Sequence, residues 1–103
     1  MYKSGDIILV NVQYTDTYEV KKRPGLILYE EFNNYVVAGI TSNKNMNGIP
    51  LLKSEGAVKN SVIKLNYIFT VSSSMIIKKL FTASTEKKRT VCNEIKKKLI
   101  QLK

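Results

Sequence analysis

The sequence of 103 residues predicts a mainly β protein, a small and mostly antiparallel barrel of five to seven strands that ends in one α-helix. The apolar run at residues 7–10 is typical of a strand covered on both faces. Residues 61–70 alternate between the two faces of a sheet, and near Ser84 the apolar spacing changes to three or four residues. We therefore expect one core and one domain over residues 1–103.

The first strand is expected at residues 6–14, which are rich in β-branched side chains. Residues 15–23 are polar and carry charges of both signs, which predicts a loop of nine residues. A second strand is expected at residues 24–29, where Pro24 is tolerated because it occupies the first position.

A third strand is expected at residues 35–42, after a turn at residues 30–34. Because side chains alternate along a strand, Thr41 and Ser42 are expected on opposite faces and could not both line one site. Residues 43–48 are rich in asparagine and predict a loop.

Three more strands are expected in the second half of the chain. A short one at residues 49–53 contains Pro50 and therefore belongs at a sheet edge. Longer ones are expected at residues 61–70, with Lys64 and Tyr67 on opposite faces, and at residues 75–81.

The C-terminal residues 85–102 predict an amphipathic helix capped by Ser84 or Thr85, with Glu86 in its first turn. The apolar residues at helical spacing are Val91, Ile95, Leu99 and Leu102. Lysines near the end of the helix complement its dipole.

The charge is unevenly distributed. Seventeen basic and eight acidic residues give a net charge of +9, and the charges of residues 1–55 cancel, so that the excess lies after Gly56. The half of the chain after Gly56 forms either a solvated face or a surface for a polyanion. We expect it mainly to attract RNA or an acidic protein.

Several function classes are excluded by composition. The chain has no histidine, which removes histidine bases, nucleophile pairs and metal ligands, and Cys92 alone forms neither a disulfide nor a structural zinc site. We expect no cofactor, no metal and no membrane partner, and a cytoplasmic location, since no signal peptide is recognisable. The remaining side chains suit phosphoryl transfer in which the substrate carries its own nucleophile, as the 2′-hydroxyl of RNA does.

Several short motifs follow one another in a fixed order along the chain. A strand opens with Gly-Asp at residues 5–10, and an Arg-Pro motif precedes an apolar strand at residues 23–28. Residues 32–34, an Ile-Thr strand end at residues 38–42, and residues 60–70 with the terminal helix come after them. In these motifs the sequence resembles the MazF/PemK toxins of type II toxin–antitoxin modules.

The resemblance implies an SH3-like antiparallel β-barrel, MazF/CcdB-like, with a C-terminal α-helix, and a homodimer. It also implies a metal-independent endoribonuclease that cleaves single-stranded RNA (mRNA), leaves 2′,3′-cyclic phosphate and 5′-hydroxyl ends, and is neutralised by a cognate antitoxin with an acidic tail. The catalytic arginine and threonine of the family fall on Arg23 and Thr41.

The other candidates for catalysis or RNA binding are Glu19, Lys21, Lys22, Ser42, Lys44, Tyr67 and Phe69. Three features depart from the family pattern. Lys21 and Lys22 stand where the relatives carry small residues, which adds positive charge beside the site. Relatives commonly carry a glutamate five residues before the arginine, where this chain has Tyr18, and Glu19 lies one position later. Many relatives carry a basic residue at the position of Phe69, which either packs in the core or stacks on a base.

Two other functions fit the same residues. A CcdB-like toxin on this fold would bind gyrase, and a non-catalytic nucleic-acid-binding β-barrel would bind RNA with a steep dependence on salt.

Overall fold

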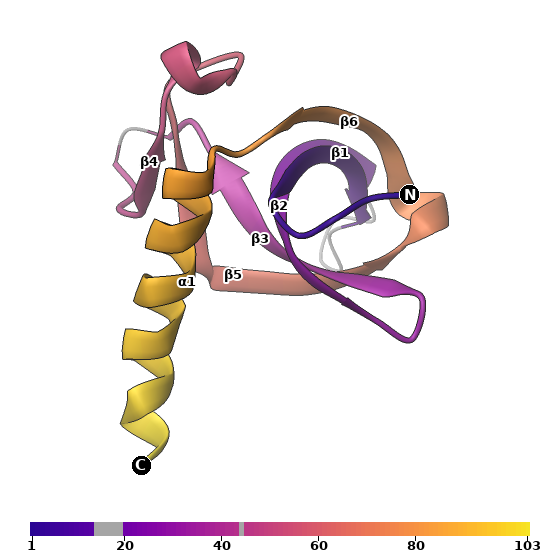
Figure 1. Cartoon of the computed structure of the whole chain (residues 1–103). Coiled ribbons are helices and arrows are strands. Elements are labelled where there is room, and N and C mark those ends of the chain that lie inside the picture. The colour runs from indigo at the N-terminus through magenta and orange to yellow at the C-terminus, as the bar shows by residue number, and fades with distance from the viewer. Residues whose placement is uncertain (14–19, 44) are drawn as a thin grey trace.

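The structure, a computed structural model, describes residues 1–13, 20–43 and 45–103. Its strands form one curled antiparallel sheet in the order β4-β5-β3-β2-β1-β6, and α1 lies beside the sheet (Figure 1). The elements are β1 (Asp6–Gln13), β2 (Val20–Glu31), β3 (Asn34–Thr41), β4 (Ile49–Leu51), β5 (Ser61–Ser72), β6 (Ile76–Thr82) and α1 (Thr85–Leu99). Short 3₁₀ turns occupy Lys53–Glu55, Ser73–Met75 and Ile100–Leu102. The predicted class, a small antiparallel barrel with a C-terminal helix, is confirmed.

Both faces of the sheet are covered by apolar side chains. Ile7 and Leu26 belong to one buried cluster, which includes Val91 of α1, whereas their neighbours Ile8 and Ile27 belong to a second cluster. The alternation follows from the two-residue period of a strand. The prediction that the first strand is covered on both faces is therefore confirmed, and each such side chain contributes roughly 1.5–3 kcal/mol by burial.

The second strand begins earlier than predicted. Val20–Arg23 pair with residues 10–13 of β1, so the last four residues of the predicted loop at 15–23 are strand. These four side chains are exposed, and hence no apolar alternation marks them in the sequence. Pro24 accordingly lies inside β2 rather than at its first position. It is tolerated because the pairing of β2 with β3 starts only at Gly25, which leaves no strand opposite Pro24 on that side.

The turn between β2 and β3 is tighter than the predicted turn at residues 30–34. Phe32 and Asn33 have φ angles of 52° and 65°, the left-handed pair typical of a two-residue hairpin turn. The third strand then ends at Thr41, one residue before the predicted end.

The shorter β4 pairs only with β5 and contains Pro50, which confirms its predicted place at the sheet edge. It ends at Leu51 rather than at Lys53, because the following residues turn: the backbone N–H of Leu52 donates to the Glu55 carboxylate at 2.8 Å. The strand β5 extends two residues beyond its predicted end at Thr70.

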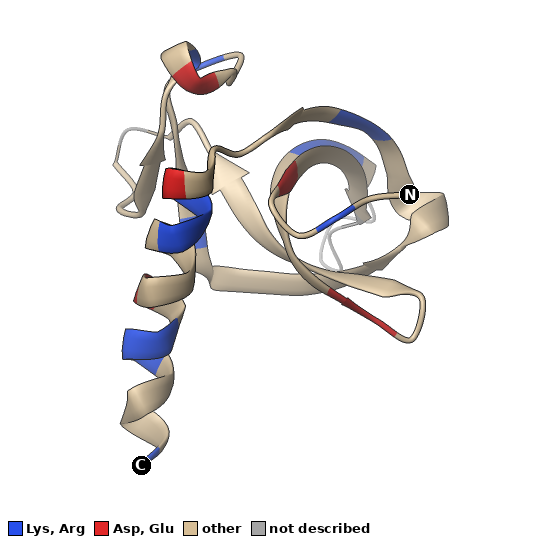
Figure 2. Cartoon of the chain, viewed as in Figure 1, with Lys and Arg blue, Asp and Glu red and all other residues tan. Residues whose placement is uncertain are grey.

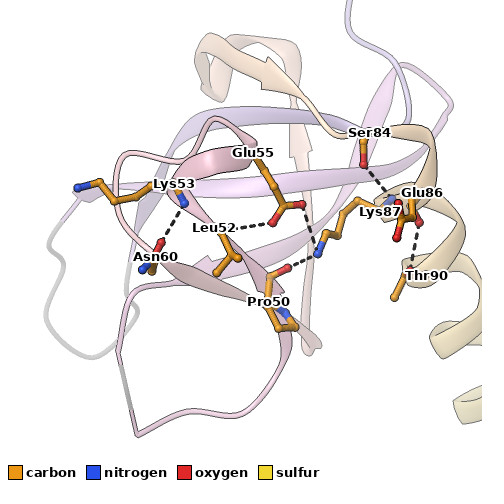
Figure 3. Close-up of polar contacts among 9 residues, drawn as sticks. All are labelled: Pro50, Leu52, Lys53, Glu55, Asn60, Ser84, Glu86, Lys87 and Thr90. Carbon is orange, nitrogen blue, oxygen red and sulfur yellow. Dashed lines mark hydrogen bonds and ion pairs between the residues drawn. The ribbon is translucent and has the colours of Figure 1, made fainter.

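The helix α1 is capped by Ser84, whose hydroxyl accepts the Lys87 backbone N–H at 3.0 Å. The Lys87 side chain returns to the sheet edge, where its Nζ donates to the Pro50 carbonyl and lies 3.4 Å from Glu55 Oε1 (Figure 3). These contacts, together called the Lys87 clasp, connect the first turn of α1 to β4 and the 3₁₀ turn after it.

The packing of α1 against the core ends at Ile95. Val91 is buried and Ile95 is half-buried, whereas Leu99 is 56% and Leu102 is 84% exposed. The apolar face predicted for the helix therefore continues past the core of a single chain. Within the described ranges, no helix is both long enough and apolar enough to cross a membrane.

Candidate functional site

The sheet opens between β2 and β3. Their pairing ends at Gly25 and Gly39; beyond it, Arg23 stays paired with β1, and Thr41 stays paired with β5. The antiparallel register, continued by two residues, would set Arg23 opposite Thr41. Arg23 and Thr41 therefore flank the opening.

Two cavities of about 430 and 500 Å³ adjoin at this opening. Four residues line both of them: Arg23, Pro24, Ile40 and Thr41. The first cavity continues toward β6 and the segment before β5, with Lys59, Lys78 and Phe81 in its wall. The second continues over β5, with Met46, Lys64, Tyr67 and Phe69 in its wall. An extended ligand could thus occupy both cavities and cross Arg23 and Thr41.

Thr41 is held in a local turn. Its Oγ1 accepts the backbone N–H of Asn43 at 3.1 Å, which leaves the hydroxyl proton for donation to a ligand. Because β3 ends at Thr41, strand alternation does not extend to the next residue, and Ser42 lines the first cavity together with Thr41. The prediction that these two residues could not share a site is wrong.

Arg23 is exposed and lies within β2. Pairing with Val10 fixes its backbone, and the following proline restricts it to extended geometry. A guanidinium carries five N–H donors in a planar fork, which matches two oxygens of a phosphate.

The charges around the opening have one sign. The cavity linings contain Arg23, Lys59, Lys64 and Lys78, and no aspartate or glutamate among the described residues. Three of these cations come from the basic half after Gly56, and basic residues also recur along α1 (Figure 2). Part of the charge excess is therefore at the site, not only around it, and it favours an anionic ligand.

The remaining sequence candidates divide into three groups. Tyr67 and Phe69 line the second cavity, and Phe69 also packs against a buried core cluster. Phe69 therefore has both the core contact and the cavity position that the sequence left as alternatives. Lys21 and Lys22 are exposed on β2 and line neither cavity. Glu19 and Lys44 lie outside the described residues.

The sequence did not indicate Lys64 as a site residue. A simple alternation puts Lys64 and Tyr67 on opposite faces, but the Lys64 ammonium lies 5.5 Å from the centre of the Tyr67 ring. The cause is a bulge in β5: Ala38 pairs with Ile68, whereas the next residue, Gly39, pairs with Lys64. Three residues of β5 are thus unpaired with β3, and such a bulge leaves no distinct sequence pattern.

In the part of the chain that the structure describes, no group of three or more histidine, cysteine, aspartate or glutamate side chains could hold a metal ion.

Comparison with known proteins assigns the family. The model of the PemK-like, MazF-like toxins of type II toxin–antitoxin systems matches residues 3–99. Among solved structures, the Mycobacterium tuberculosis toxin MazF-mt6 is similar, with a TM-score of 0.65 and 19% identity over 84% of this chain and 89% of that one, which supports the fold. None of the curated proteins matches the chain. Since the family model spans almost the entire sequence, this chain belongs to the PemK-like, MazF-like toxins of type II toxin–antitoxin systems.

Proposed function

We propose that this toxin is a metal-independent endoribonuclease that cleaves single-stranded RNA. Its substrate is mRNA, and its location is the cytoplasm. One observation carries the proposal: Arg23 and Thr41, from two strands that separate at the opening, line both adjoining cavities. A strand of RNA crossing from one cavity to the other would bring a backbone phosphate to this pair.

The chemistry needs no cofactor, because RNA supplies the nucleophile. The 2′-oxygen forms a bond to the adjacent phosphorus, and the bond from phosphorus to the 5′-oxygen breaks. A base accepts the 2′-hydroxyl proton, and the departing 5′-oxygen gains a proton. The products are a 2′,3′-cyclic phosphate and a free 5′-hydroxyl.

In this reaction Arg23 and Thr41 stabilise charge. The guanidinium would donate to two non-bridging oxygens of the phosphorane, and the free proton of the Thr41 hydroxyl would donate to one. A single preorganised donor of this kind contributes about 10²–10³-fold to turnover. Because Arg23 carries several donors and a charge, its removal should cost at least that much.

The described cavity walls hold no carboxylate and the chain has no histidine, and these are the side chains that most often act as general bases. Glu19 is our candidate, since it lies four residues before Arg23. Arginine itself stays protonated near neutral pH and is a poor base.

Bases on either side of the cleaved phosphate would occupy the two cavities. Tyr67 is half exposed and, with Phe69, offers aromatic surface on which a base can stack. Lys21, Lys22 and Lys44 are candidates for contacts with the RNA backbone.

The cognate antitoxin would use the same electrostatics. A tail rich in aspartate and glutamate would be attracted by the cations lining the cavities and would exclude RNA from them. We therefore expect the antitoxin to compete with RNA.

We also propose that the toxin is a homodimer. Leu99, Ile68 and Tyr29 are each about half exposed around a groove of about 500 Å³ between α1 and the sheet. Large exposed apolar patches usually mark an interaction surface, and a second copy of the chain is the occupant to which we commit.

To test the activity, the wild type and the variants Arg23→Ala, Thr41→Val and Lys79→Ala are incubated with labelled single-stranded RNA in EDTA. Lys79 is an exposed cation that lines neither cavity and serves as the control. We expect cleavage by the wild type and Lys79→Ala, a loss of at least 100-fold in Thr41→Val, and a larger loss in Arg23→Ala.

Other outcomes contradict the proposal. A requirement for added metal, or undiminished cleavage by Arg23→Ala, would overturn the mechanism. RNA binding without cleavage would favour the non-catalytic barrel, and capture of gyrase without RNA cleavage would favour a CcdB-like toxin.

A further inference from the structure

Lys64 is a buried cation in the wall of the second cavity. Its residue is only 9% exposed, and its Nζ donates to the Asn47 carbonyl at 2.8 Å. The same ammonium lies 5.5 Å from the centre of the Tyr67 ring. The side chain is therefore fixed from two sides, by the segment between β3 and β4 and by β5.

The position of Lys64 depends on the bulge in β5. Lys64 is the last residue before the unpaired stretch, and Tyr67 is at its end. The bulge brings both side chains to the wall of the cavity that also contains Arg23 and Thr41.

An ammonium with this little exposure needs a partner, because burial of an isolated charge costs several kcal/mol. The carbonyl and the ring supply partial negative charge but no counter-ion. The ion pairs found among the described residues are Lys87 with Glu55 and Lys97 with Glu94, so no described carboxylate neutralises Lys64. An ammonium has three N–H donors, and the Asn47 carbonyl takes one.

We propose that Lys64 forms a subsite for a phosphodiester of the bound RNA, next to the phosphate that Arg23 and Thr41 hold. The inference rests on the proposed function, since it assumes that RNA occupies the second cavity. A strand that leaves Arg23 and Thr41 through this cavity would run along the wall that holds both Tyr67 and the Lys64 ammonium. Lys64 is thus a substrate-positioning residue, which raises affinity without entering the bond-breaking step.

The test separates the charge of Lys64 from its hydrogen bond. Lys64→Met removes both, whereas Lys64→Gln removes the charge and keeps an N–H donor for the Asn47 carbonyl. Lys79→Met is the matched control for loss of one exposed charge outside the cavities. Circular dichroism melting curves establish that each variant is folded.

Two measurements are made on each protein over a series of salt concentrations. Cleavage of labelled single-stranded RNA in EDTA gives KM and kcat. Binding of a randomised 2′-O-methyl RNA, which lacks the attacking hydroxyl, is followed by fluorescence anisotropy and gives Kd without any cleavage.

For both Lys64 variants we expect KM and Kd to rise about tenfold at low salt, as for the loss of one charge-assisted contact. The slope of log Kd against log salt should fall by about 0.7, the value for one phosphate contact on a single strand. Turnover at saturating RNA should stay within about threefold of the wild type. Lys79→Met should change Kd less than about twofold.

Near-wild-type affinity in Lys64→Gln would overturn the inference, because the role of Lys64 would then be only to hydrogen-bond the Asn47 carbonyl and not to bind a phosphate. So would a change in both variants no larger than that in Lys79→Met. If the wild type does not cleave RNA, the proposed function is wrong. Binding of the 2′-O-methyl RNA would still decide whether Lys64 contacts a phosphate, so the two proposals can fail independently.

Discussion

The Lys87 clasp is expected to stabilise the fold and the wall of the first cavity. In Lys87→Met the apolar stem is kept, but the ammonium and its contacts with the Pro50 carbonyl and the Glu55 carboxylate are lost. The 3₁₀ turn that contains Glu55 leads directly into residues 56–59, which line the cavity. Loosening the clasp should therefore affect both stability and the site.

The magnitude follows from burial. The Lys87 and Glu55 side chains are 16% and 28% exposed, so their interaction is only partly screened by solvent. A charge-assisted hydrogen bond contributes roughly 1.5–3 kcal/mol and a partly exposed ion pair up to about 1 kcal/mol. Since the Met side chain fills much of the same space, we expect a net loss of about 2 kcal/mol, which corresponds to a decrease in Tm of about 8–16 °C for a domain of this size.

The assay is thermal unfolding followed by circular dichroism, with Lys97→Met as the matched control. Lys97 also pairs with a glutamate, Glu94, at 3.1 Å, but the two side chains are 75% and 40% exposed. Loss of that pair should cost less than about 0.5 kcal/mol. If both variants lowered Tm equally, burial would not distinguish the two pairs and the reasoning would be refuted.

Two further predictions concern α1. Leu99→Glu places a charge on the exposed apolar groove, so we expect the dimer to dissociate into folded monomers. Analytical ultracentrifugation measures this. If the variant sediments as the wild type does, the groove is not the dimer interface. Replacement of Lys96, Lys97 and Lys98 together by Gln should raise KM several-fold at low salt and leave kcat unchanged, because these side chains line neither of the two site cavities. A lower kcat at saturating RNA would contradict the view that these lysines attract RNA but take no part in cleavage.

Much of the fold could be predicted because burial leaves a pattern in the sequence. The first strand and the helix cap were recognisable from the run of β-branched residues and from Ser84 followed by a periodic apolar face. Val20–Arg23 could not be recognised as strand, since all four side chains are exposed and only their pairing with β1 makes them extended. Pairing is a tertiary property that a polar segment does not encode in its periodicity.

Less of the candidate site than of the fold could be predicted from the residues alone. Arg23 and Thr41 were assigned through the resemblance to the family, and each alone would be an ordinary strand residue. The proximity of Lys64 to Tyr67 was beyond sequence reasoning, because a bulge changes which residues share a face without changing composition.

The same short motif that ends the pairing of β2 with β3 also forms the candidate site. Pro24 has no N–H to donate to a neighbouring strand, and a Cβ at the adjacent Gly25 would collide with Val37 Cγ1. The last β2–β3 pair is thus formed by two glycines, Gly25 and Gly39, and the strands separate immediately beyond it. Arg23 is the first residue past the proline, so the break that creates the opening also fixes the backbone of the arginine at its edge. In the Arg-Pro-Gly sequence the glycine permits the last close pair with β3, the proline stands where that pairing ends, and the arginine supplies the charge at the opening.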